Sequence, residues 1–229
     1  LNRRVEILPD GEISVSIQTR HSRADLLVSE LMVFTNAEVG RFCASEKIPV
    51  FYRVQQAPDI SEVEPTENER LHRYRVLKQM RPASSSLIPG AHGGLGVTPY
   101  CQSTSPLRRY LDLVTQRQLA GVLAGQTIPY TEEDLTAVGE GNTDSSRTIG
   151  RLERQRERYW LCRYLSALRG ETFDALVLDV WSHNCKVEVV DFAWQVDVRM
   201  NKDVTPGDIV SVRLNRVDEW DLGISFGMV

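Results

Sequence analysis

The sequence predicts an α+β fold, with a helix-rich part over residues 1–169 and a small β-rich part over residues 170–229. Before residue 169, apolar side chains recur at helical spacing in several segments, whereas after Gly170 short runs alternate apolar and polar residues. With 229 residues, of which 41% are hydrophobic and 25% are charged, the chain is long enough for one sizeable core and a small satellite domain. We therefore expect two domains, 1–169 and 170–229.

The first hundred residues predict a β-hairpin followed by two helices. Val5 and Ile7 precede a Pro-Asp-Gly turn and a second alternating run, a pattern typical of a hairpin. Leu27 and Leu31 begin a helical spacing that extends over 23–47, and polar residues then lead to a second helix expected near residues 67–80. Because the chain opens on a hairpin without an initiator Met, we interpret it as the C-terminal portion of a longer protein.

The segment 103–119 has the most informative local pattern in the chain. Ser105 is a favoured N-cap and Pro106 suits the first helical position, so a helix is predicted to begin at about Pro106. Its first turn would hold Arg108 and Arg109 at the end where the helix dipole disfavours cations. Two explanations are open. The arginines bind an anion together with backbone N–H groups, or they pair with nearby carboxylates.

A strong helix is predicted over residues 144–168, after a surface connection at 126–150 with a short helix following Thr131. Four of its arginines fall on one face: Arg147, Arg151, Arg154 and Arg158. Glu153 and Glu157 lie beside them and could neutralise part of the charge by helical pairing. This face is either a solvated charged surface or a basic surface for an anionic partner.

After Gly170 the pattern predicts about five short strands in 60 residues, with a Pro-Gly turn at 206–207. That number of strands in so short a segment suits a small closed barrel of the OB type. Barrels of this type often bind single-stranded nucleic acid on aromatic platforms. The candidate platforms are Trp181, Phe192, Trp194 and Trp220. The alternative for each is a place in the barrel core, because small barrels need bulky interiors.

Composition narrows the function classes further. The net charge of −4 gives no global sign of nucleic-acid binding, so such a role must depend on local basic patches. No apolar run approaches the length of a membrane span. The four cysteines lack Cys-x-x-Cys spacing, which favours a reducing, cytoplasmic location over a zinc site or a disulfide framework. The glycine-rich segment 92–96 lacks a P-loop ending and is better suited to close packing or a tight turn.

Several segments, taken in order, resemble the C-terminal half of the RNase II (RNB) family of 3′→5′ exoribonucleases. Residues 26–32, Leu-Leu-Val-Ser-Glu-Leu-Met, resemble the family's Leu-Val-Glu-Glu-x-Met helix motif, with Ser29 replacing one acidic residue. Residues 92–97 resemble its Gly-Leu-Gly segment, and residues 104–113, Thr-Ser-Pro-Leu-Arg-Arg-Tyr-Leu-Asp-Leu, resemble its most diagnostic stretch. Glu153 and Arg154 belong to a segment similar to the late helix that precedes the family's terminal barrel.

This resemblance implies hydrolysis of single-stranded RNA from the 3′ end to nucleoside 5′-monophosphates, with Mg²⁺. It gives Arg108 the role of supporting the scissile phosphate, a form of electrostatic stabilisation, with Arg109 as the secondary candidate beside Ser105. Glu30 matches an acidic position near the 3′-terminal ribose, where a carboxylate can accept from the 2′-OH and help to distinguish RNA from DNA. Glu153 and Arg154 match positions that line the RNA channel.

The chain departs from the family in one respect that matters for catalysis. The family's metal-binding aspartates belong to a motif upstream of the opening hairpin, so the Mg²⁺ ligands are expected outside this chain. We therefore expect activity only together with the missing N-terminal portion, in an enzyme that is monomeric and has no membrane segment. Two other functions stay open: a non-catalytic RNA-binding protein that retains this scaffold, and a protein-interaction scaffold.

Overall fold

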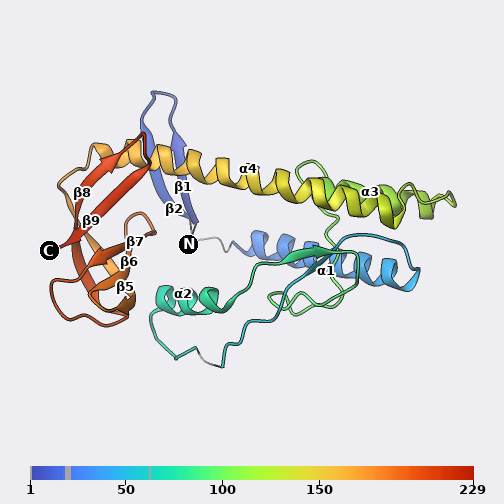
Figure 1. Ribbon diagram of the computed structural model, residues 1–229, viewed down its shortest axis with the longest axis horizontal. Coiled ribbons are helices and arrows are strands. Elements are labelled where there is room, and N and C mark those ends of the chain that lie inside the picture. The colour runs from blue at the N-terminus through green and yellow to red at the C-terminus, as the bar shows by residue number, and fades with distance from the viewer. Residues whose placement is uncertain (1, 19–21, 62) are drawn as a thin grey trace. The chain divides into compact units, whose positions relative to one another are not determined.

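The computed structural model describes residues 2–18, 22–61 and 63–229. Contacts divide the chain into two compact units: the first comprises residues 1–20, 64–75 and 149–229, and the second comprises 21–63 and 76–148. Two helices, α2 (Glu69–Gln79) and α4 (Glu132–Ser166), contribute residues to both units (Figure 1). The predicted domain boundary between residues 169 and 170 stays a prediction, because the two contact units are not divided there. By contacts, the β-rich part shares its unit with the opening hairpin and the end of α4.

The first unit begins with the predicted hairpin. Strands β1 (Asn2–Ile7) and β2 (Ile13–Gln18) pair antiparallel, with Val5 opposite Val15. Gly11 in the connecting turn has φ +87°, a conformation that glycine adopts without strain. The hairpin prediction is therefore confirmed.

Five strands in the same unit form the predicted small barrel: β5 (Thr172–Trp181), β6 (Asn184–Val189), β7 (Trp194–Arg199), β8 (Ile209–Asp218) and β9 (Gly223–Met228). They form one antiparallel sheet in the order β7-β6-β5-β8-β9, and contacts between the two edge strands nearly close it. Inward-facing residues such as Val187 and Val212 pack around Leu161 and Leu165 of α4. The α+β fold with a five-stranded terminal barrel is confirmed.

The second unit is built around two helices and a short strand pair. Helix α1 (Arg23–Ser45) starts with a capping box between Ser22 and Asp25, and its last three turns bury Cys43 against strand β3 (Tyr52–Val54). Strand β3 pairs antiparallel with β4 (Ser84–Ser86). Helix α3 (Tyr110–Leu123) packs Leu119 and Val122 against this core, and its Val114 forms a second cluster with Phe51 and Leu135.

The predicted start of α3 at Pro106 is wrong by four residues. Residues 105–108 form a separate turn, closed where the N–H groups of Arg108 and Arg109 donate to the Ser105 carbonyl at 3.3 and 3.0 Å. Arg109 then has extended backbone angles, φ −128° and ψ 110°, and is the N-cap of a helix that begins at Tyr110. The arginine pair consequently precedes the first turn of α3.

The prediction of a surface connection followed by a separate helix is also wrong, because α4 is one 35-residue helix. Its N-terminus has a reciprocal cap, in which the Thr131 hydroxyl accepts from the N–H of Asp134 and that carboxylate accepts from Thr131. Leu135 is fully buried in the second unit, and Gly139 leaves room for the Phe51 ring. Within the described ranges, no helix is long and apolar enough to cross a membrane.

Candidate functional site

A buried carboxylate organises the turn that precedes α3. The side chain of Asp112, 2% exposed, accepts from the backbone N–H of Ser105 at 2.9 Å and from Nε of Arg109 at 3.0 Å. Nη2 of Arg109 also lies 2.7 Å from the same oxygen. One carboxylate thus neutralises Arg109 and fixes the turn that carries Arg108.

The two neighbouring arginines have different partners, and the structure shows the carboxylate alternative for Arg109, whereas anion binding at Arg108 stays a prediction. Arg109 pairs with Asp112, as the carboxylate alternative predicts. The Arg108 side chain is exposed, and its only hydrogen bond in the described part of the chain is a long one, 3.5 Å, to the Ser105 hydroxyl. An exposed guanidinium without a carboxylate partner is available to an anion.

A buried polar network supports this turn from the other side. The Asn36 amide, on α1, donates to the hydroxyls of Tyr100 and Thr104 at 3.0 and 3.3 Å. Its carbonyl oxygen accepts from the backbone N–H and the hydroxyl of Ser103. These bonds tie residues 100–104 to α1 and so fix the chain immediately before Ser105. A network that satisfies its buried members in this way rigidifies its surroundings.

Strand β3 adds a cation that was not among the site residues predicted from the sequence. The backbone N–H of Arg53 donates to the Tyr100 carbonyl at 2.8 Å, and its guanidinium donates to the Ser85 hydroxyl at 3.4 Å. Burial, and secondarily the charge of Arg109, lowers the pKa of Arg53. The motif patterns gave no signal for Arg53, because it reaches the site only through strand pairing.

The glycine-rich segment packs closely, as its preferred interpretation predicted. A Cβ on Gly93 would lie 2.3 Å from backbone atoms of Ala57, and one on Gly94 would lie 2.4 Å from the Gln55 side chain. Gly96, with φ +67°, makes the tight turn. Burial, and to a smaller extent the charge of nearby Arg53, lowers the pKa of His92. These glycines therefore serve backbone packing between β3 and the loop.

The remaining predicted site residues lie elsewhere. Glu30 is on the exposed first half of α1, and its side chain has no hydrogen bond or ion pair with another described residue. Glu153 and Arg154 are exposed on the part of α4 that belongs to the first unit, whereas Ser105, Arg108 and Arg109 belong to the second. The structure therefore brings Ser105, Arg108 and Arg109 together. Among the described residues, it shows no hydrogen bond or ion pair between these three and Glu30, Glu153 or Arg154.

The basic face of α4 in the first unit has its own partners. The guanidinium carbons of Arg158 and Arg3 lie 5.5 and 4.7 Å from the centre of the Trp194 ring. Arg3 also donates to the Glu157 carboxylate through Nε at 3.0 Å and Nη2 at 2.7 Å. Arg154 has no carboxylate partner among the described residues. The face is thus partly neutralised and partly free.

The four candidate aromatic platforms of the barrel divide into three groups. Phe192 is buried and packs edge-to-face against Phe173, so it belongs to the core. Trp194 is partly buried beneath its two guanidinium groups. Trp181 and Trp220 are 40% and 94% exposed, and the core alternative is wrong for both.

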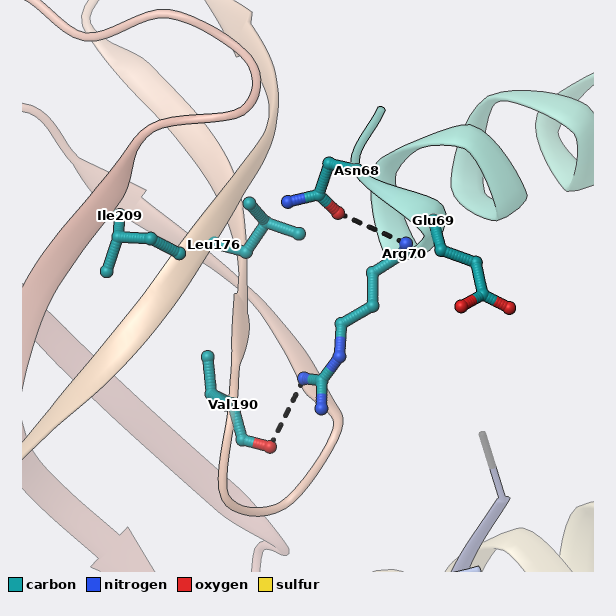
Figure 2. Close-up of a pocket in the computed structure, with 6 residues that line it drawn as sticks. All are labelled: Asn68, Glu69, Arg70, Leu176, Val190 and Ile209. Carbon is teal, nitrogen blue, oxygen red and sulfur yellow. Dashed lines mark hydrogen bonds between the residues drawn. The ribbon is translucent and has the colours of Figure 1, made fainter. Parts of the chain in front are cut away.

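A shallow pocket of about 400 Å³ lies in the first unit, between the start of α2 and the barrel (Figure 2). Its lining residues are Asn68, Glu69, Arg70, Leu176, Val190 and Ile209. Figure 2 shows Arg70 reaching the Val190 carbonyl, at 3.3 Å, and Asn68 accepting from the Arg70 N–H. Arg70 also pairs with buried Glu188 at 3.4 Å. Arg70, the one cationic side chain among the described residues that line the pocket, therefore already holds the start of α2 against the barrel.

Over residues 2–18, 22–61 and 63–229, no three His, Cys, Asp or Glu side chains are grouped so that they could hold a metal ion. All four cysteines are buried free thiols. Burial raises the pKa of Cys43 to about 11 and that of Cys101 to about 12, so neither is an activated nucleophile.

A model of the RNB domain matches residues 59–125, which include the turn that carries Arg108. An uncharacterized ribonuclease of Synechocystis sp. is 28% identical over 225 residues, covering 93% of this chain and 33% of the relative. The chloroplastic/mitochondrial ribonuclease II of Arabidopsis thaliana is 26% identical over 231 residues, covering 96% of this chain and 29% of the relative. The chain is therefore similar to ribonucleases of the RNB family over nearly its whole length. It spans about a third of the length of these curated RNB relatives.

Solved structures of RNB proteins have the same fold. An active-site mutant of the Dss1 exoribonuclease from Candida glabrata matches with TM-score 0.83 and 22% identity, over 98% of this chain and 31% of that one. Mycoplasma genitalium RNase R in complex with ribose-methylated single-stranded RNA matches with TM-score 0.80 and 18% identity, over 100% and 46%. Yeast Ssd1, a pseudonuclease, matches with TM-score 0.67 and 16% identity, over 86% and 30%. The RNB fold thus occurs in a nuclease and in a pseudonuclease.

Proposed function

We propose that the chain is part of a hydrolytic 3′→5′ exoribonuclease that degrades single-stranded RNA to nucleoside 5′-monophosphates. The observation that carries this proposal is that two adjacent arginines have different partners, in a chain similar to RNB ribonucleases. Asp112 engages Arg109, whereas Arg108 is exposed on a fixed turn without a carboxylate partner. A guanidinium held in this way suits a phosphate whose negative charge increases during hydrolysis.

Each site residue then has a stated role. Arg108 contacts the scissile phosphate, and the Ser105 hydroxyl, which accepts from Arg108, steadies its guanidinium. Arg109 is a positioning residue, because Asp112 neutralises its charge and the hydrogen bond between them fixes the turn. Glu30 accepts from the 2′-OH of the terminal ribose. In the other unit, Glu153 and Arg154 line the path of the RNA.

Mg²⁺ is the cofactor that the family resemblance implies, and the described residues of this chain do not fit a site for it. No group of three acidic, His or Cys side chains is present in the described ranges, and Asp112 is committed to Arg109 and Ser105. The proposal therefore assigns the Mg²⁺ ligands to another portion of the same protein. A monomeric state and a cytoplasmic location stay predictions.

The partner for this chain is proposed to be the N-terminal portion of the same protein. In the described structure, the first three turns of α1 leave Leu27, Leu31 and Phe34 exposed by 61%, 55% and 62%. These residues share one helical face, and apolar patches of this kind mark interaction surfaces. Amide hydrogen exchange over residues 23–35 should slow markedly in the full-length protein. Equal exchange in the chain and in the full-length protein would contradict this assignment.

The test of the proposed function is a single-turnover assay with Arg108→Ala in the full-length protein. We expect cleavage of a single-stranded oligoribonucleotide to fall by roughly 10²–10³-fold, as for the loss of one preorganised donor, with RNA affinity largely kept. Arg41→Ala is the matched control, because Arg41 is half-exposed in the same unit and its one ion pair among the described residues is with Glu38. A near-normal rate for Arg108→Ala would remove the role assigned to that residue.

A non-catalytic RNA-binding protein is the second candidate, since the fold also occurs in a pseudonuclease. Wild-type full-length protein that binds RNA but shows no turnover with Mg²⁺ would favour it. A protein-interaction scaffold is distinguished by salt: RNA affinity should fall steeply with rising salt, because phosphate contacts release counterions. An absent or flat RNA response would favour the scaffold.

A further inference from the structure

Arg53 has an uncompensated charge in a region that is already positive. Arg53, Arg108 and Arg109 belong to the same unit, and Asp112 is the only carboxylate that pairs with any of them in the described ranges. The one polar contact of the Arg53 side chain is the neutral Ser85 hydroxyl. Two guanidinium groups therefore lack an ionic partner within this part of the unit.

Hydrogen bonds connect the strand that carries Arg53 to the segment just before the turn. Its backbone N–H bonds the Tyr100 carbonyl, and Tyr52 bridges to Cys101 on the same strand. From Tyr100 the Asn36 network leads to Ser103, two residues before the turn that Asp112 closes. Arg109 is close enough that its charge destabilises protonated Arg53. The repulsion between like charges that the fold holds together decreases when an anion binds between or beside them.

One buried polar atom in the same unit as Arg53 lacks a hydrogen-bond partner. Within the described residues, Nδ1 of His92 has no donor or acceptor beside it, whereas Nη2 of Arg109 is ion-paired with Asp112. Buried polar groups without partners are rare, and they occur where a ligand or water completes the site. The residue beside the guanidinium, Ser85, offers a hydroxyl on exposed strand β4. Arginine with serine is a common donor set for phosphate oxygens.

We propose that Arg53, with the Ser85 hydroxyl, binds a phosphodiester of the RNA next to the one at Arg108, with Arg109 behind it as electrostatic support. The inference rests on the proposed function, because it requires RNA at Arg108. It adds a second phosphate position to the same unit. RNA would then be held at two neighbouring linkages by two cations that Asp112 leaves unneutralised.

The experiment measures binding of a fluorescent single-stranded oligoribonucleotide to the chain as a function of salt, in EDTA so that the RNA stays intact. Each phosphate contact on a single strand contributes about 0.7 to the slope of log affinity against log salt. We expect Arg53→Gln to reduce the magnitude of this slope by about 0.7 and Arg53→Lys to keep it. Arg108→Gln should also reduce it by about 0.7. Arg41→Gln, the charge-matched control on α1, should not change it.

The outcomes separate this inference from the proposed function. A normal slope in Arg53→Gln, together with a reduced slope in Arg108→Gln, overturns the role of Arg53 and leaves the proposed function standing. Unchanged slopes in both variants overturn both. No RNA binding by the wild-type chain overturns the role of Arg53, while the proposed function still depends on the single-turnover assay of the full-length protein. If Arg53→Gln does not fold, methylphosphonate linkages scanned along the RNA replace it. Neutralising either of two neighbouring linkages near the 3′ end should lower the wild-type slope, and a single sensitive linkage contradicts the inference.

Discussion

Asp112 is the residue whose replacement tests the organisation of the site most directly. Its side chain is 2% exposed and accepts from Ser105 and Arg109. Asp112→Ala leaves the backbone N–H of Ser105 without an acceptor and the guanidinium of Arg109 without a counter-charge. Breaking a buried ion pair costs about 3–5 kcal/mol. Because the Arg109 side chain is 27% exposed and water can partly replace its partner, we expect about 3 kcal/mol, the lower end.

Asp112→Asn separates the two contributions. The amide oxygen can still accept from the Ser105 N–H, but the charge opposite Arg109 is gone, so the expected loss is about 1.5 kcal/mol. Urea denaturation of the chain measures both values as shifts in midpoint at constant slope. Asp144→Ala is the control, because Asp144 is 86% exposed and 3.7 Å from its partner Arg147. If Asp112→Ala and Asp144→Ala lose equally little, within about 0.5 kcal/mol, the central role of Asp112 is refuted.

Three further predictions concern the packing, titration and reactivity of the second unit. Gly93→Ala should lower the free energy of unfolding by about 2–4 kcal/mol, because the new Cβ meets the backbone of Ala57 at 2.3 Å; a loss below about 1 kcal/mol in urea denaturation would contradict this packing. Burial holds the pKa of His92 below its ordinary value of 6.5 in the folded chain, so the unfolded chain takes up the proton first as pH falls. Stability should therefore decrease between pH 7.5 and 5.5 by more in the wild type than in His92→Gln, and equal pH profiles would rule this out. Cys43 and Cys101, with pKa values raised to about 11 and 12 by burial, should resist thiol reagents at pH 8 until urea unfolds the chain, and rapid labelling of the native chain would disprove their burial.

Strong periodic patterns made most of the fold predictable. The Pro-Asp-Gly turn and alternating flanks specify the hairpin, and alternation after Gly170 specifies the barrel, because both patterns encode one buried face. Helix α4 was misjudged because glycines lower its local helix propensity. Burial of Leu135 and the cap at Thr131 outweigh that propensity through tertiary packing, which a local pattern does not contain.

The site was predictable in part for a similar reason. Ser105 and Pro106 predicted the start of a helix, but residues 105–108 form a separate turn and the helix begins at Tyr110. Asp112 draws both Ser105 and Arg109 toward its carboxylate, and Arg109 must take extended backbone angles to reach it. Arg53 comes from a strand more than fifty residues upstream. No spacing rule connects such positions, since only the β3 pairing brings them together.

The anchoring of the opening hairpin has a consequence for how the protein is made. Arg3 is held by Glu157, by the carbonyl of Phe192 and by the ring of Trp194, partners that lie in the last third of the chain. During synthesis the hairpin therefore leaves the ribosome long before the residues that secure it, and it must wait for them while the second unit folds. Long-range closure of this kind is slow. A chain shortened at its C-terminus would thus lose the barrel and, with it, the anchors of the β1–β2 hairpin.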